Sequence, residues 1–188
     1  LLAAAGIPPA MTLGGYSGVL LGTTSVPLWS TSPMLGGLFM ASAIASGTAA
    51  VALAPGPTGQ DDATAQAALG TISIAAGASE LALAGGFLAT SGPAAKPLLK
   101  GGEGKLFLGA AIATTTALAL EIAGSKSSNH TLRALAATAT LAGGAMLRWA
   151  VVRAGHTSAL DRDANLESMR VTADNPGWSP PAADAGLP

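Results

Sequence analysis

The chain has no cysteine and few charged residues. Of its 188 residues, none is cysteine and 10% are charged, whereas a soluble domain usually carries about 25% charged residues. Without cysteine the chain can form no disulfide, thiolate metal site or protein-ligated iron–sulfur cluster. Any iron–sulfur chemistry would therefore belong to a partner protein.

The sequence also lacks a basic excess. Its formal net charge is −1 and 49% of its residues are hydrophobic. With no basic patch, we expect no nucleic-acid partner. An acidic cluster, a glycine-rich phosphate loop and a Ser/His/Asp set are likewise missing from the sequence. A chain so poor in charge is expected in the membrane, in contact with lipid, and not as a soluble globular domain.

Five apolar runs are long enough to cross a bilayer, which takes roughly 20 residues. They cover residues 10–29, 34–54, 64–90, 106–124 and 133–153, and turn-rich segments separate them. Pro27 and several glycines interrupt the first run. We therefore predict an all-α, polytopic transmembrane bundle of about five spans within residues 1–156.

Ala, Gly, Ser and Thr dominate these runs. Small residues let helix backbones approach closely in lipid, where packing drives association. Gly14, Gly18 and Gly22 recur at four-residue steps, as do Ser42 and Ser46. Helix packing is the simplest interpretation of both patterns.

Basic residues predict the orientation of the chain, because Lys and Arg are enriched in cytoplasmic loops. The loop after the second run has Asp61 and Asp62 and no basic residue. Alternating the spans places seven of the nine basic residues on one face, which we predict to be cytoplasmic, in a bacterial or archaeal cytoplasmic membrane. Trp29 and Trp149 fall at the same boundary and are predicted to be interfacial aromatics.

Residues 157–188 form a polar tail, predicted to be cytoplasmic. It lacks the apolar pattern of a packed domain, so we expect a disordered or extended segment. Alternatively, the tail lies along a partner subunit with Trp178 as an anchor.

Ionisable groups inside the spans are candidates for function, because each costs roughly 2.5–3.5 kcal/mol or more in hydrocarbon. Glu80 lies near the middle of the third run, and Ser73 and Gly77 share its helix face. This spacing fits a proton relay or a contact to a polar head group. A structural hydrogen bond between helices is the equal alternative.

Two further ionisable residues fall in the later runs. Glu121 shares a face with Thr114, and near a span boundary it could simply reach interfacial water. Arg148 follows Thr140 and Gly144 at four-residue steps. It can pair with a carboxylate, but snorkelling to the cytoplasmic surface is the favoured interpretation.

The two histidines argue against a haem held by this chain. On the predicted topology His130 and His156 lie on opposite sides of the membrane, whereas two axial histidines must lie at one depth. We expect no metal site.

Two stretches resemble the NrfD/polysulfide reductase membrane-subunit family. Residues 15–29 read GYSGVLLGTTSVPLW and are followed by LFMASA at 38–43; the family reads tGvLL…vPlW before lFlaSa…sG. Residues 143–156 begin GGAMLRW and end VVRAGH, similar to the family's last helix. The likeness covers most of residues 14–156.

The resemblance implies a haem-free, quinone-interacting membrane anchor that is not itself catalytic. Such subunits dock an iron–sulfur subunit, often linked to a molybdopterin catalytic subunit, and exchange electrons with the quinone pool. The chain would be the C-terminal bundle of a longer subunit, with no covalently bound or metal-ligated cofactor and with quinone or quinol as its ligand. The candidate residues for a quinone site or proton pathway are Glu80, Ser73, Tyr16, Glu121 and Arg148. Tyr16 and Glu80 are chosen on physical grounds, because no motif of the family assigns them a role.

Two alternatives stay open. One is half of a secondary transporter or permease, since broken helices near a midplane carboxylate suit Pro27 and Glu80. The other is a purely structural membrane anchor.

Overall fold

The computed structural model describes residues 2–54, 63–127, 129–162, 165 and 166. Across this part of the chain the regular structure is helical and contains no strand. The predicted all-α transmembrane bundle is therefore confirmed. Asp61, Asp62 and most of the predicted tail, including Trp178, lie outside the described residues.

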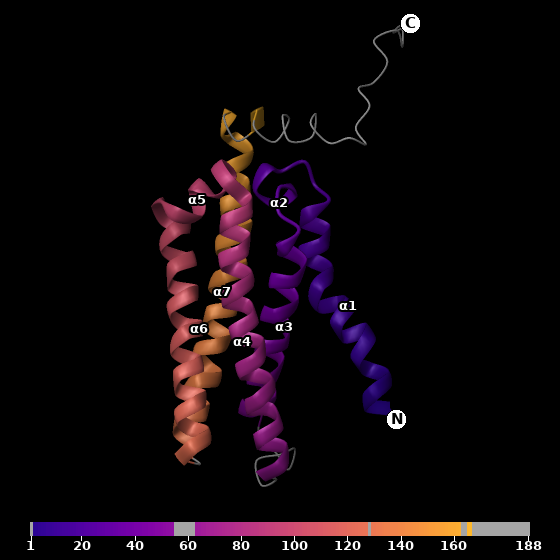
Figure 1. Ribbon diagram of the computed structural model, residues 1–188, viewed down its shortest axis with the longest axis vertical. Coiled ribbons are helices and arrows are strands. Elements are labelled where there is room, and N and C mark those ends of the chain that lie inside the picture. The colour runs from indigo at the N-terminus through magenta and orange to yellow at the C-terminus, as the bar shows by residue number, and fades with distance from the viewer. Residues whose placement is uncertain (1, 55–62, 128, 163–164, 167–188) are drawn as a thin grey trace, which may run out of the picture.

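Long helices alternate in direction along the chain (Figure 1). They are α1 (Leu2–Gly22), α3 (Met34–Leu53), α4 (Ala63–Ser91), α6 (Gly101–Ser127) and α7 (His130–Leu160). Short helical segments cap one end: α2 (Pro27–Ser30), the 3-10 helix η1 (Gly92–Ala95) and α5 (Lys96–Leu99). We call this end the α2/α5 end and the opposite one the His130 end.

Four helices among the described residues are long and apolar enough to cross a membrane. They are Met34–Leu53, Thr64–Leu99, Gly101–Ser125 and His130–Leu160. The first predicted span, residues 10–29, is not one continuous helix, because the chain leaves α1 after Gly22 and re-enters helix at Pro27. The hydroxyl groups of Thr23 and Thr24 donate to backbone carbonyls three residues earlier, which satisfies the frayed end of α1.

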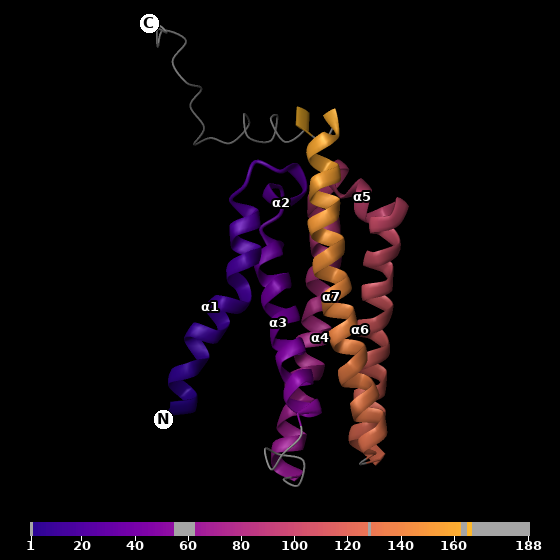
Figure 2. The ribbon, with the colours of Figure 1, turned by 180° about the vertical axis from the view of Figure 1, so that it is seen from behind.

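The helices α3, α4, α6 and α7 form a ring in which each contacts the next, and α1 packs outside it against α3. Figures 1 and 2 both show α1 diverging from α3 towards its N-terminus. Gly18 makes the closest approach, because a Cβ there would lie 2.7 Å from the Leu35 carbonyl oxygen. The small-residue steps predicted to pack α1 therefore do so.

Large apolar side chains gather towards the α2/α5 end. The main buried cluster contains aromatic and leucine side chains from α2, α3, α4, α5, α6 and α7: Leu28, Trp29, Leu35, Leu38, Phe39, Phe87, Leu98, Phe107 and Leu147. Towards the His130 end, the buried residues of α3 and α7 are mostly alanine, among them Ala45, Ala49, Ala136 and Ala137.

Trp29 holds α2 against the second half of α7. Its indole Nε1 donates to the Val151 carbonyl at 3.1 Å, and its ring contacts the backbone of Gly155, where no Cβ stands in the way. The Ser158 hydroxyl oxygen accepts from the Leu28 amide at 3.3 Å. Trp29 is only 7% exposed, so the prediction that it is an interfacial aromatic is wrong: α2 folds back and buries it against α7. Trp149, 62% exposed, has the accessibility of such a residue.

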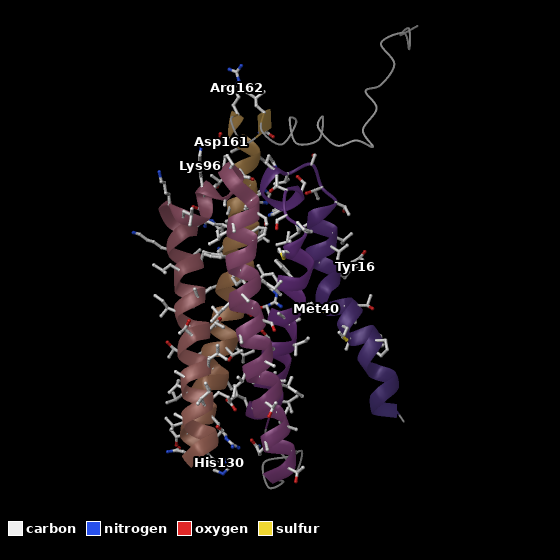
Figure 3. The ribbon with its side chains drawn as sticks, viewed as in Figure 1. Tyr16, Met40, Lys96, His130, Asp161 and Arg162 are labelled. Atoms are coloured by element: carbon white, nitrogen blue, oxygen red, sulfur yellow. The ribbon has the colours of Figure 1, made fainter. Side chains whose placement is uncertain are left out.

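Charged and polar residues mark the two ends. Lys96, Asp161 and Arg162 lie at the α2/α5 end and His130 at the other (Figure 3). Arg153 on α7 pairs with Glu103 on α6, 3.4 Å apart, at the α2/α5 end. The two histidines lie at opposite ends of α7, as predicted.

Candidate functional site

Glu80 is a buried acid in the middle of α4. It is 4% exposed, and the hydroxyl group of Thr114 on α6 donates to its Oε1 at 2.8 Å. Both side chains lie inside spans that cross the bilayer by length and composition. A hydrogen bond to a buried carboxylate offsets part of the cost of taking the charge out of water.

Two adjacent glycines of α7 let the neighbouring helices pack closely against it near Glu80. A Cβ at Gly143 would lie 3.0 Å from the Thr114 hydroxyl oxygen, and one at Gly144 would lie 2.8 Å from the hydroxyl oxygen of Ser46 on α3. Side chains at these positions would push α6 and α3 away. The Gly143-Gly144 pair therefore fits α7 between two polar neighbours.

Arg148 completes this layer from α7. Its Nη1 donates to the Ser42 hydroxyl oxygen and to the Gly144 carbonyl, both at 3.3 Å, and its guanidinium lies 5.8 Å from the centre of the Phe39 ring. The side chain thus turns back along α7 instead of reaching the α2/α5 end. The favoured interpretation, snorkelling to the surface, is wrong, because Ser42 and Phe39 provide partners within the bundle.

Ser42, Glu80, Thr114 and Arg148 form what we call the inner polar ring, with one residue from each helix of the bundle. Glu80 acts electrostatically on Arg148, yet no direct ion pair joins these two described residues. A small cavity, lined mainly by apolar side chains, adjoins Glu80 beside Leu81, Phe107 and Leu147. The ring brings a carboxylate and a guanidinium to one level of the bundle, each with a hydroxyl partner from a neighbouring helix.

A second polar cluster lies towards the His130 end. Glu121 and Arg133 line a small pocket together with Thr48, Gln66 and Ser73, drawn from α3, α4, α6 and α7. Arg133 Nη1 donates to Gln66 Oε1 at 3.0 Å. We call this the Glu121 pocket.

The structure divides the polar stripe predicted on α4. Ser73 lines the Glu121 pocket, whereas Glu80 belongs to the inner polar ring. Between them, a Cβ at Gly77 would lie 2.9 Å from Leu118 of α6. The leucine side chain fills the space left by the glycine and separates the two polar sites.

Tyr16 belongs to neither site. It is 55% exposed and lies on α1, outside the ring (Figure 3). The face between α3 and α4 carries an open, mostly apolar groove of about 450 Å³ beside Met40, Ile44 and Leu83. Its lining suits a hydrocarbon chain.

Arg133, Gln66 and Ser42 were not predicted as site residues. Arg133 could have been suspected, because it sits within the first turn of an apolar run. The partners of Ser42 and Gln66 lie 106 and 67 residues away, so no local pattern marks them. Among the described residues, no group of three or more His, Asp or Glu side chains could hold a metal ion.

A sequence model of the family described as "Polysulphide reductase, NrfD" matches residues 1–159. This range holds both polar sites and every helix of the bundle except the last residue of α7. The comparisons with curated proteins and with solved structures found no match to the chain.

Proposed function

Because the chain belongs to the polysulphide reductase NrfD family, we propose that it exchanges electrons between the quinone pool and a partner iron–sulfur subunit. Members of this family are membrane subunits of oxidoreductase complexes. A molybdopterin-type catalytic subunit would complete the complex. In this proposal the chain supplies the membrane anchor, contact with quinone or quinol and a route for protons, while the redox centres belong to its partners.

The hydrogen bond from Thr114 to the buried Glu80 carboxylate carries the proton part of this proposal. Reducing a quinone to a quinol consumes protons as well as electrons. A group that passes protons inside a bilayer must be able to hold one there, and intramembrane acids commonly mark such routes. We propose that Glu80 plays this part, with Arg148 as an electrostatic partner of its carboxylate.

The apolar groove between α3 and α4 supports the quinone part. Quinones carry a long apolar tail, and this groove opens towards the surrounding lipid with an apolar lining. We propose that the tail lies there. Glu80 does not line this groove and accepts its hydrogen bond from Thr114 of α6, so in this proposal a proton reaches the head group through the bundle and not by direct contact.

The charge distribution supports an orientation. Lys96, Lys100 and Lys105 are exposed at the α2/α5 end, as are Arg153 and Arg162. We propose that this end faces the cytoplasm of a bacterial or archaeal cell, in keeping with the enrichment of basic residues on that side.

Purification of the native complex tests the proposal. We expect an iron–sulfur protein to co-purify with the chain, and a quinone analogue to bind specifically and to inhibit electron transfer. Absence of both the partner and specific analogue binding would overturn it. That result would favour the transporter alternative, whose substrate site would involve Glu80.

A further inference from the structure

The Glu121 pocket contains a buried donor without a partner. Arg133 reaches Gln66 through Nη1, but none of the described residues accepts a hydrogen bond from its buried Nε. The Nε atom of a guanidinium is always protonated and can therefore only donate a hydrogen bond. Leaving such a donor unpaired costs about 1–3 kcal/mol or more, so a partner inside the pocket is expected.

An acid forms the other side of the same pocket. Glu121 Oε1 lies against Gly70, 3.0 Å from where a Cβ would stand. Arg133 acts on Glu121 electrostatically, yet the two described side chains form no direct ion pair. They line one pocket and leave a space between them.

The chemistry of the lining selects what fills this space. A metal cation would be repelled by Arg133 and an anion by Glu121, while an apolar group would leave the Nε donor unpaired. Water accepts from Nε and donates to the carboxylate at the same time. The free volume of about 20 Å³ exceeds the roughly 10–15 Å³ that one water requires, and Thr48 and Ser73 offer further hydroxyl partners.

We propose that the Glu121 pocket is a hydrated proton-loading site. The bridging water donates one of its own protons to the Glu121 carboxylate as it receives another from bulk water. The carboxylate becomes a carboxylic acid, and the bridging molecule remains neutral water throughout. Arg133 holds the water through Nε and is itself held by Gln66. Among the described side chains lining the pocket from all four helices, Arg133 is the charged group that faces Glu121.

An apolar barrier separates this loading site from the inner polar ring. Thr114 and Glu121 are seven residues apart on α6, or roughly 10 Å along the helix. Leu118 fills the turn between them against Gly77. A proton on Glu121 therefore cannot pass directly to Glu80. Its transfer requires that the Leu118 side chain move or that water enter the space that this side chain fills. This last step rests on the proposed function, whereas the hydrated site does not.

Infrared difference spectroscopy of the native complex over a pH titration tests the site. We expect a carbonyl band of a protonated carboxyl group and an ordered-water O–H band that titrate together. Glu121→Gln should abolish both. Glu103→Gln, which removes the ion pair with Arg153 at the other end of the bundle, is the matched control and should keep both bands.

Gly70→Ala provides a second variant that keeps the acid. Its methyl group would press on Glu121 Oε1, so we expect the water band to disappear while the carbonyl band shifts. Titrating bands that persist unchanged in Glu121→Gln, or a water band untouched by Gly70→Ala, would overturn the proposal. Loss of quinone binding or of the partner with these bands intact would instead count against the proposed function alone.

Discussion

The two ends of the bundle are built differently. At the α2/α5 end, Trp29, Phe39, Phe87 and Phe107 fill the space between the helices. At the His130 end the helices meet through alanine and glycine, and a pocket lined by Glu121 and Arg133 lies between them. The inner polar ring stands between these regions.

The two ends therefore differ in how tightly the helices are packed and in how much room they leave for water. Large side chains leave no room for water and hold each helix through many weak contacts. Small side chains bring the helices close without filling the space around polar groups, so a water-sized pocket persists beside Glu121. We infer that the α2/α5 end fixes the geometry of the bundle and that the His130 end admits protons.

The largest expected effect is at Gly155. In Gly155→Ala the new methyl group would overlap the Trp29 ring, which must leave its site and lose the bond to Val151. We expect a loss of about 3 kcal/mol in the free energy of unfolding, from overpacking and one lost hydrogen bond, together with a red shift in tryptophan fluorescence. Gly85→Ala, whose Cβ would meet nothing within 4 Å, is the control. Equal stability of the two variants would mean that α2 is not fixed on α7.

The inner polar ring should respond less strongly. Thr114→Val removes the donor to Glu80, and we expect a loss of about 1–2 kcal/mol because the buried carboxylate is left unpaired. Thr115→Val is the neighbouring control, since the Thr115 hydroxyl is exposed and bonds only to the Ala111 carbonyl of its own helix. Thermal unfolding of the purified complex compares the two. Matching midpoints would show that the bond to Glu80 adds no stability.

Arg148→Lys should have a smaller effect. Lysine keeps the charge but loses the planar group that faces Phe39 and reaches Ser42, so we expect a loss of about 1 kcal/mol. Arg153→Lys is the control, because Arg153 is 57% exposed and exposed pairs contribute about 0–1 kcal/mol. Denaturant titration of both variants measures the difference. If Arg153→Lys costs more, Arg148 is not anchored inside the bundle.

Tyr16→Phe should have the smallest effect. The Tyr16 side chain is 55% exposed and lies on α1, away from both polar sites. We expect a stability change within about 0.5 kcal/mol and an unchanged rate of electron transfer from quinol. A clear drop in that rate would place the quinone head group on the outer face of α1.

The four helices that form the ring were predictable, because each apolar run ends in residues that favour turns. The predicted range 34–54 became Met34–Leu53, and 64–90 became Ala63–Ser91. The interruption of the first run at Pro27 and its glycines was visible in the sequence, but counting the run as one span was wrong, because the helix ends at Gly22 and begins again at Pro27. That break depends on Trp29 packing against α7, a contact between residues 122 positions apart.

The residues of the sites were partly predictable, but their grouping was not. The cost of charge in hydrocarbon marks Glu80, Glu121 and Arg148 in the sequence. Which helices face each other depends on close contacts such as Gly77 with Leu118 and Gly144 with Ser46. For this reason Ser73 was grouped with Glu80 although it lines the Glu121 pocket.

Proton uptake during quinone reduction by the complex in liposomes tests the central claim most directly, with Glu80→Gln compared to wild type and to Glu103→Gln. Glutamine keeps an acceptor for Thr114 but cannot carry a proton. The account predicts that Glu80→Gln assembles and binds quinone but takes up protons much more slowly, while Glu103→Gln behaves as wild type. Proton uptake in Glu80→Gln at the wild-type rate would contradict it and leave Glu80 a structural role alone.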